Sequence, residues 1–156
     1  MTEGCDRVHT AMKMLRNGSR QVIAIELDNE NIEQGNFVKE VFEWADNKRY
    51  DFKYIRGNMA EVPKMGLGKF DLVTALCSIY YLDDDSIIRL IQHISTLTDV
   101  IILQCNVARQ LGRTDKHTYT KASVDYAVKT LKANGFAAVK VIAPYLYSRP
   151  LVIGKK

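Results

Sequence analysis

Glu26 is the residue best placed for chemistry, because it closes the short apolar run 21–25. A run of this kind, bounded by polar residues, predicts a strand of a parallel sheet that is covered on both faces. In doubly wound folds, an acid at the carboxyl end of such a strand holds the ribose hydroxyls of an adenosine-containing ligand. Glu26 is therefore a candidate ligand-binding residue, and Asp28 takes that role if the register is shifted.

Candidates for substrate chemistry follow later in the chain. Tyr80 and Tyr81 lie beyond a strand expected over 70–76, where the ligand crevices of α/β sheets form. We expect one tyrosine to face the pocket and the other to pack. His117 lies in a polar loop, and its ordinary pKa of ~6.5 makes it a candidate base, with an exposed loop histidine as the alternative.

Other polar residues have structural explanations. Cys105 and Asn106 end a further expected strand, and a buried thiol and a loop amide are favoured over pocket roles. Asp83 opens a run of three acids before a helical pattern, where acids favour the helix dipole, so we expect capping and not metal binding. The three cysteines form no CxxC pair, which argues against a zinc site or a disulfide framework.

An alternating series of helices and strands is expected to position these residues. Residues Val38, Val41, Phe42 and Ala45 form the stripe by which the second helix should face the sheet. Helices are expected over 8–17, which Gly18 ends in a left-handed conformation, over about 30–46, from Asp83 onward and over 121–134; strands are expected over 22–27, 52–56, 70–76, 100–105, 137–142 and 150–153.

This order predicts an α/β fold, a Rossmann-like and mostly parallel sheet with helices on both faces and a C-terminal antiparallel strand pair. We expect residues 1–156 to form a single domain. The scattered Lys and Arg residues, with a net charge of +4, do not predict a nucleic-acid partner. No apolar run approaches the ~18 residues of a membrane helix, and no signal peptide is visible. The odd number and wide spacing of the cysteines indicate a reducing compartment, so a cytoplasmic protein is expected.

The order of elements, with the segments 22–28, 57–59, 70–73 followed by 78–82, and 147–153, resembles the class I S-adenosylmethionine-dependent methyltransferases. The resemblance implies S-adenosylmethionine as cofactor, with Glu26 on the ribose and the segment at Asn58 on the adenine. The cofactor-binding residues it implies are Gly4, Cys5, Glu26, Leu27, Asn58, Met59, Leu76 and Cys77, the catalytic residues are Tyr80 and His117, and no metal is implied.

The chain departs from this family at its first motif, which reads as a strand, an acid and a glycine-rich loop. Gly4 and Cys5 match the start of that loop, but Val8 stands where its last glycine belongs, and a β-branched side chain obstructs close approach to a ligand. Only Met1 precedes Thr2, too little to form the first strand, so we expect strands 22–27 and 70–76 to lack their central neighbour. Three solutions are open: the strands close up, another segment fills the gap, or a homo-oligomer supplies a strand.

The activity implied by the resemblance is methyl transfer to a small molecule, such as the hydroxyl of a sugar or metabolite. The Asn/Asp-Pro-Pro-Tyr/Phe motif of amino-group methylation is absent after the fourth strand. The alternative is a degenerate, non-catalytic relative that serves as a binding or interaction domain. A dehydrogenase-like domain is less favoured, because nothing supplies a hydride-transfer site and the terminal strand pair points to methyltransferases.

Overall fold

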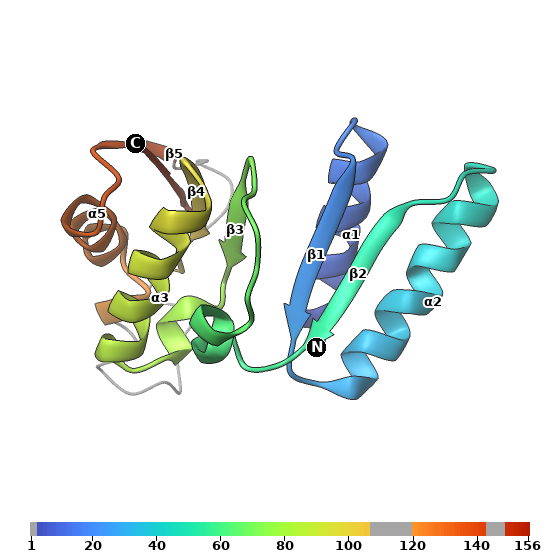
Figure 1. Cartoon of the computed structure of the whole chain (residues 1–156), viewed down its shortest axis with the longest axis horizontal. Helices are drawn as coiled ribbons and strands as arrows, with labels where there is room; N and C mark the ends of the chain where they lie inside the picture. The colour runs from blue at the N-terminus through green and yellow to red at the C-terminus, as the bar shows by residue number, and fades with distance from the viewer. Residues whose placement is uncertain (1–2, 107–119, 143–148) are drawn as a thin grey trace. The chain divides into compact units, whose positions relative to one another are not determined.

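The computed structural model describes residues 3–106, 120–142 and 149–156, with side chains from Val8 onward. The chain divides into two compact units, residues 1–59 and 60–156, and each is described by itself (Figure 1). The first unit contains α1 (Glu3–Arg16), β1 (Gln21–Glu26), α2 (Asn29–Ala45) and β2 (Asp51–Arg56). The second contains β3 (Val73–Leu76), η2 (Ile79–Tyr81), α3 (Asp84–Leu97), β4 (Val100–Gln104), α5 (Val124–Ala133), β5 (Ala138–Ile142) and β6 (Leu151–Lys155), and η1 (Met59–Lys64) leads into it.

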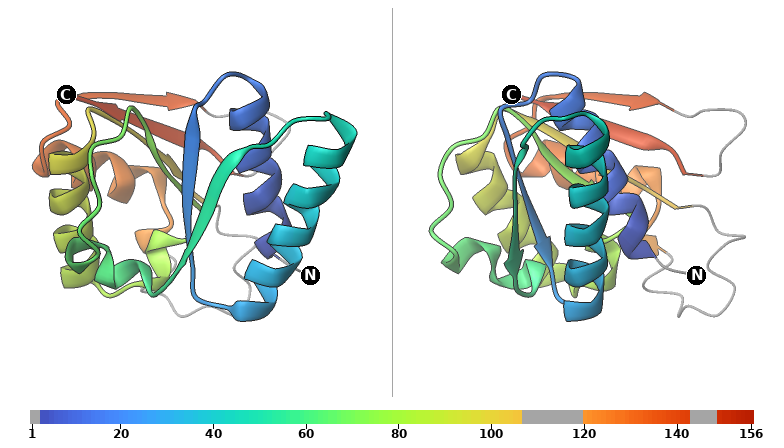
Figure 2. Two further views of the ribbon diagram at one scale, coloured as in Figure 1. Left: turned by 45° about the vertical axis from the view of Figure 1, so that its right-hand side comes forward. Right: turned by 90° about the vertical axis from the view of Figure 1, so that its right-hand side faces the viewer.

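In the first unit, two helices cover one face of a two-stranded parallel sheet. β1 and β2 pair from Gln21 with Asp51 to Glu26 with Arg56, and α1 and α2 lie side by side on the same face of this pair (Figures 1 and 2). The core beneath the helices consists of Val8, Met12, Leu15 and Tyr50, packed against Val22, Val38, Phe42, Phe52 and Tyr54.

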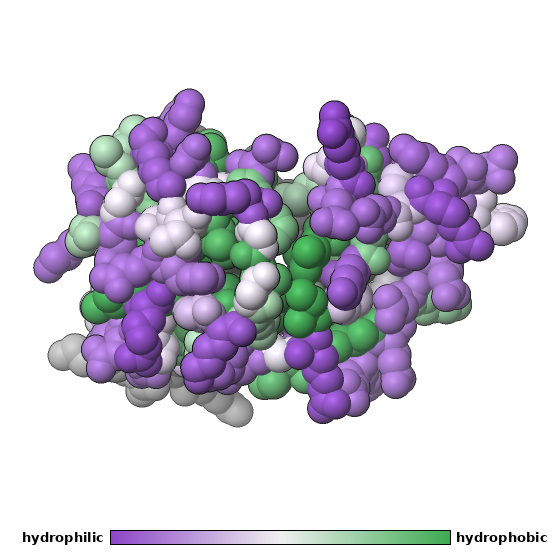
Figure 3. Space-filling model, viewed as in Figure 1, coloured by the Kyte–Doolittle hydropathy of each residue, from purple (hydrophilic) through white to green (hydrophobic). Residues whose placement is uncertain are grey.

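The other face of this sheet is also apolar. Val22 and Phe52 point to the helices, so alternation along the strands turns Ile23, Ile25 and Ile55 to the opposite side. Hydrophobic side chains accordingly gather over β1 and the adjoining part of β2 on that face (Figure 3). β1 thus carries apolar side chains on both faces, as the sequence predicts for a strand that is covered on both faces.

The helix ends of the first unit follow local sequence signals. Gly18 has a φ of +103° after α1, and Ser19 N donates to Met14 O at 3.1 Å, which confirms the predicted left-handed helix end. Asp28 is the N-cap of α2, since its side chain accepts a hydrogen bond from Glu30 N at 2.9 Å.

Two expectations for these helices are wrong. α1 begins at Glu3 and not at residue 8, so Gly4 and Cys5 lie in its first helical turn and form no loop. In α2, Val38 and Phe42 pack on the core as expected, but Val41 and Ala45 are exposed. The apolar residues of α2 therefore occupy two faces of the helix.

Glu43 is a buried carboxylate that holds the end of α2 against the start of β2. Its oxygens accept hydrogen bonds from Tyr50 N at 2.8 Å and form ion pairs with Lys39 and Arg49, both at 2.9 Å. Burial by itself raises the pKa of Glu43, but the hydrogen bonds from Tyr50 N, Lys39 and Arg49 together lower it from the ordinary 4.5 to about 2.

Replacing Glu43 by Gln should therefore lower the free energy of unfolding at pH 7 by about 1–3 kcal/mol. Because the pKa is lowered in the folded protein, the contribution is complete above pH 4.5 and is lost as the pH falls toward about 2. Urea titrations followed by far-ultraviolet circular dichroism measure this at several pH values. The exposed Glu40→Gln on the same helix is the control, and a difference that persists unchanged at pH 2 contradicts the assignment.

The sheet of the second unit has the order β3-β4-β6-β5. β3 and β4 are parallel, and β6 runs antiparallel to both β4 and β5, which confirms the predicted terminal antiparallel pair. The strand expected over 70–76 is shorter, Val73–Leu76, and its residues are half-buried and not buried.

α3 confirms the capping interpretation of the acidic triplet. Asp83 is its N-cap and accepts hydrogen bonds from Ser86 N at 2.8 Å and Ser86 Oγ at 2.7 Å. These bonds lower the pKa of the Asp83 carboxyl. The buried stripe of the helix contains Ile87, Leu90, Ile91 and Ile94.

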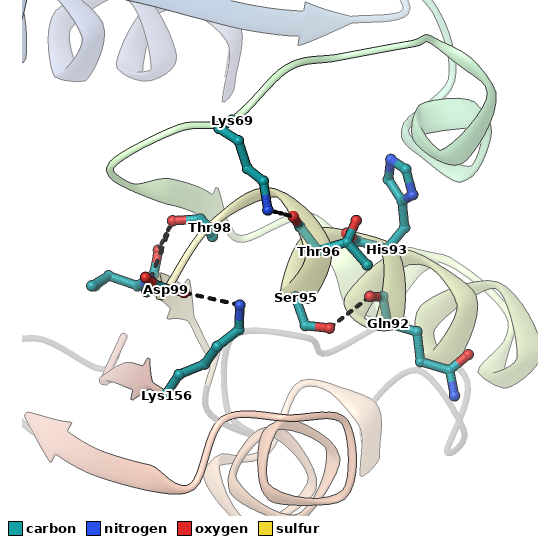
Figure 4. A network of polar contacts seen from close by, with 9 residues as sticks. Lys69, Gln92, His93, Ser95, Thr96, Thr98, Asp99 and Lys156 are labelled. Carbon is teal, nitrogen blue, oxygen red and sulfur yellow. Dashed lines mark hydrogen bonds and ion pairs between the residues drawn. The ribbon is translucent and has the colours of Figure 1, made fainter.

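Polar contacts tie the end of α3 to the start of β4 (Figure 4). Lys69 Nζ donates to Thr96 O, Thr98 Oγ1 accepts from Val100 N at 3.2 Å, and Lys156 Nζ donates to Asp99 Oδ1 at 2.9 Å. The contact with Lys156 lowers the pKa of Asp99. This network lies at the amino end of β4, the edge opposite the one where ligands bind in α/β sheets, so we assign it a structural role.

β1 and β3 belong to separate sheets. Among residues 3–106, 120–142 and 149–156, β1 pairs only with β2, and β3 pairs only with β4. Which of the three expected solutions applies to the first strand therefore stays a prediction. No helix within the same residues is long and apolar enough to cross a membrane.

Candidate functional site

Glu26 is fixed at the carboxyl end of β1. Its side chain is only 7% exposed, and Oε1 accepts hydrogen bonds from Leu27 N at 2.8 Å and Asp28 N at 3.1 Å. The carboxylate is thus held over the turn that leads into α2, where a negative charge lies near the positive end of the helix dipole.

The turn after β2 lies directly beside Glu26. β2 pairs Arg56 with Glu26, and Gly57 N donates to Glu26 O at 3.0 Å. The structure therefore brings the predicted ribose residue and the predicted adenine segment at Asn58 to one edge of one sheet, as parallel strands require. Leu27, also expected at the cofactor, is 63% exposed at this edge.

Asp28, the alternative to Glu26, has a different role. Its carboxylate caps α2 through Glu30 N, whereas Glu26 is the acid that ends the strand. The shift of the strand register that would give this role to Asp28 is therefore not needed, and Glu26 remains the candidate ligand-binding acid.

Gly4 and Cys5 lie in the first turn of α1. Because α1 and β1 run in opposite directions, this turn points toward the carboxyl edge of the sheet (Figure 1). Val8 is fully buried in the core with Met12 and Leu15. The expectation that Val8 obstructs a ligand loop is therefore wrong: its side chain packs inward from a helix.

In the second unit, Cys77 follows β3 with an unusual backbone. Its φ is +51°, a left-handed conformation that non-glycine residues rarely adopt and that is frequent at functional sites. Cys77 N donates to Gln104 O at 3.3 Å, and Cys77 Sγ donates to Gln104 Oε1 at 3.2 Å. These two contacts with Gln104, at the end of β4, hold Cys77 in the left-handed conformation.

The two tyrosines after β3 have different environments. Tyr80 is 2% exposed and packs with Cys77 and Ala122, whereas Tyr81 is 54% exposed. Asn106 Nδ2 donates to the Tyr80 hydroxyl at 3.5 Å. Burial and the neighbouring Cys77 raise the pKa of Tyr80 above its ordinary value, so this phenol is protonated at neutral pH and cannot serve there as a general base.

Lys121 was not anticipated from the sequence. Its side chain is buried, and Nζ donates to the carbonyl of Leu82, which ties the segment before α5 to the segment after η2. Lys121 lies in a polar stretch that predicts exposure, and only the tertiary structure reveals its burial.

Cys105 is the small buried thiol that the sequence predicts. Burial and the neighbouring Cys77 raise its pKa to about 11, so very little thiolate forms at pH 8. We expect iodoacetamide to modify Cys105 in the native protein at least about 100-fold more slowly than a free thiol. Peptide mass spectrometry measures this, and equal rates in native and urea-unfolded protein contradict it.

His117, the candidate base, lies outside the described residues, so its proposed role stays a prediction. Within the residues that the structure does describe, no group of three His, Cys, Asp or Glu side chains is placed to hold a metal ion.

No protein-family model matches the sequence, and no curated protein matches it. The structure, however, is similar to solved methyltransferases. WbdD, described as a bifunctional kinase-methyltransferase, is 19% identical with a TM-score of 0.71, over 97% of this chain and 34% of WbdD. The magnesium protoporphyrin IX methyltransferase ChlM from Synechocystis PCC 6803, with bound SAM, is 15% identical with a TM-score of 0.66, over 94% of this chain and 64% of ChlM.

An O-methyltransferase family protein from Burkholderia thailandensis is 12% identical with a TM-score of 0.62, over 87% of this chain and 43% of that protein. This chain thus spans between about one third and two thirds of the length of these three proteins. The mixed α/β fold is that of S-adenosylmethionine-dependent methyltransferases, as the sequence predicts.

Proposed function

We propose that this chain binds S-adenosylmethionine and takes part in methyl transfer to a small-molecule hydroxyl. One observation carries the proposal: the buried Glu26 carboxylate at the end of β1 lies beside the turn after β2, in a chain with a methyltransferase fold.

The residues at this edge fit the adenosine part of the cofactor. A carboxylate accepts hydrogen bonds from both hydroxyls of a ribose, and Glu26 presents a carboxylate at this strand end. The polar turn at Asn58 is the matching candidate for the adenine. Binding of SAM by ChlM in its crystal structure supports the same ligand class.

Bound S-adenosylmethionine supplies an electrophilic methyl group, so the protein needs to align an acceptor and to accept its proton. Tyr80 is unsuited to take the proton, because its pKa is raised. His117 remains the proposed base, and Tyr80 is proposed to shape the acceptor pocket from beside Cys77. The O-methyltransferase among the similar structures supports an oxygen acceptor.

Calorimetric titration with S-adenosylmethionine and S-adenosylhomocysteine tests the proposal. We expect a dissociation constant below ~100 μM, equivalent to about −5.5 kcal/mol. Absence of binding at millimolar ligand contradicts it.

A degenerate, non-catalytic binding domain is the second candidate function. The observation that favours it is the helical first turn of α1 at Gly4 and Cys5, where the methyltransferase family has a glycine-rich loop. Titration separates the two candidates, since this second function predicts no binding of either ligand.

A further inference from the structure

Cys77 is the one residue, among 3–106, 120–142 and 149–156, that has a left-handed backbone without being a glycine or an asparagine. The other non-glycine residue with a positive φ is Asn47, and asparagine tolerates this conformation because its short polar side chain bonds locally. A cysteine has no such compensation of its own. Neighbouring groups must therefore hold Cys77 at its φ of +51°, directly after β3, where the ligand crevices of α/β sheets form.

The side chain of Gln104 stabilises the left-handed form of Cys77 selectively. β3 and β4 pair Leu76 with Gln104, so these two side chains share one face of the sheet, and an extended residue 77 would point to the other face. The left-handed turn at Cys77 interrupts this alternation, and Cys77 Sγ donates to Gln104 Oε1 at 3.2 Å. This hydrogen bond is therefore available to the left-handed conformation and not to an extended one.

A second side-chain amide from the same strand end contacts the segment that Cys77 directs. After Cys77 the chain enters η2, in which Tyr80 is buried and Tyr81 is exposed. Asn106, two residues beyond Gln104, donates through Nδ2 to the Tyr80 hydroxyl at 3.5 Å. The end of β4 thus contacts the segment after β3 at its first residue and again at its buried tyrosine.

We propose that Gln104 is a positioning residue of the S-adenosylmethionine site. It holds Cys77 in the left-handed conformation and thereby fixes the segment from Cys77 to Tyr80 that borders the ligand. This inference rests on the proposed function, in which Tyr80 shapes the acceptor pocket from beside Cys77. In this role Gln104 does not touch the ligand, and its effect passes through Cys77.

A double-mutant cycle between positions 104 and 77 of the full chain tests the proposal. Gln104→Met keeps the length of the side chain but removes its acceptor, and we expect it to weaken the binding of S-adenosylhomocysteine about 3–10-fold in calorimetry. Cys77→Gly makes the left-handed conformation accessible without support. Adding Gln104→Met to Cys77→Gly should therefore change the affinity by less than about twofold. Gln92→Met makes the same chemical change on an exposed residue of α3 and should bind like the wild type.

Urea unfolding of the same proteins measures the support of Cys77 without a ligand. Because Gln104 offsets backbone strain at Cys77, Gln104→Met should lower the urea midpoint more with cysteine than with glycine at position 77. The proposal is overturned if the losses of midpoint are equal in the two backgrounds, if Gln104→Met binds like the wild type, or if it weakens binding equally in both. Absence of binding by the wild type overturns the proposed function and this role together, whereas any of the other results, obtained with a wild type that binds, overturns the role of Gln104 alone.

Discussion

Glu26→Gln is expected to weaken the binding of S-adenosylhomocysteine about 10–100-fold. The Gln carbonyl retains an acceptor for Leu27 N and Asp28 N, which now bond to Oε1 of Glu26. The charge is lost, and one of the two side-chain acceptors becomes a donor, so the ribose hydroxyls lose charge-assisted hydrogen bonds worth about 1.5–3 kcal/mol. Calorimetry with the purified variant measures the difference.

Glu30→Gln is the matched control for this substitution. Glu30 lies four residues away in the first turn of α2, is exposed and contacts Gln34, so its replacement makes the same chemical change without touching the strand end. We expect Glu30→Gln to bind like the wild type and both variants to unfold like it in urea. Equal affinity of Glu26→Gln and wild type removes Glu26 from the site, and a loss of affinity that parallels a loss of stability assigns it a structural role instead.

Gly35→Ala is expected to lower the free energy of unfolding of the first unit by about 2–3 kcal/mol. Inside a helix this change ordinarily stabilises by roughly 0.5–1 kcal/mol, so even the sign of the effect is diagnostic. A Cβ at Gly35 lies 2.7 Å from Val8 Cγ2 and from Tyr54 Cζ, and closer still to the Tyr54 hydroxyl. Val8 is fully buried and has no space to withdraw, so the two helices must separate.

Urea unfolding followed by far-ultraviolet circular dichroism reports this effect, because Gly35 lies within α2 and its replacement destabilises that helix. Gly68→Ala is the control, since a Cβ at Gly68 meets no atom within 4 Å, and its effect should stay within about 0.5 kcal/mol. Combining Gly35→Ala with Tyr54→Phe removes the atom in the shortest contact, so the two substitutions should cost less together than their sum. A stabilised Gly35→Ala variant contradicts the close packing of α1, α2 and β2.

Local signals in the sequence were sufficient for most of the framework. The apolar run that ends at Glu26 is a strand, Asp83 caps α3, and Gly18 ends α1, because each depends on neighbours a few residues away. The pairing of Glu26 with the turn after β2 was also predictable, since parallel strands end at the same edge of a sheet.

Packing between distant segments was not predictable in this way. Val41 fits a buried stripe by spacing but is exposed, because the apolar residues of α2 span more than the one face that α1 and the sheet cover. Tyr80 and Tyr81 are adjacent and identical in type, and only their distances to Cys77 and Ala122 decide which one is buried. The family motif places Val8 in a degenerate loop, whereas the helix that begins at Glu3 places its side chain in the core.

The position of β6 bears on the order in which the chain acquires its structure during synthesis. β6 lies between β4 and β5 although it follows both in the sequence, and Val152 and Gly154 on it are buried. The second unit therefore cannot complete its sheet until the ribosome has released residue 155 from its exit tunnel, whereas every element of the first unit is available once residue 59 has emerged. Nascent chains should accordingly expose β4 and β5 to chaperones for longer than β1 and β2, and truncation before Leu151, which removes β6, should leave the first unit folded and the second unfolded.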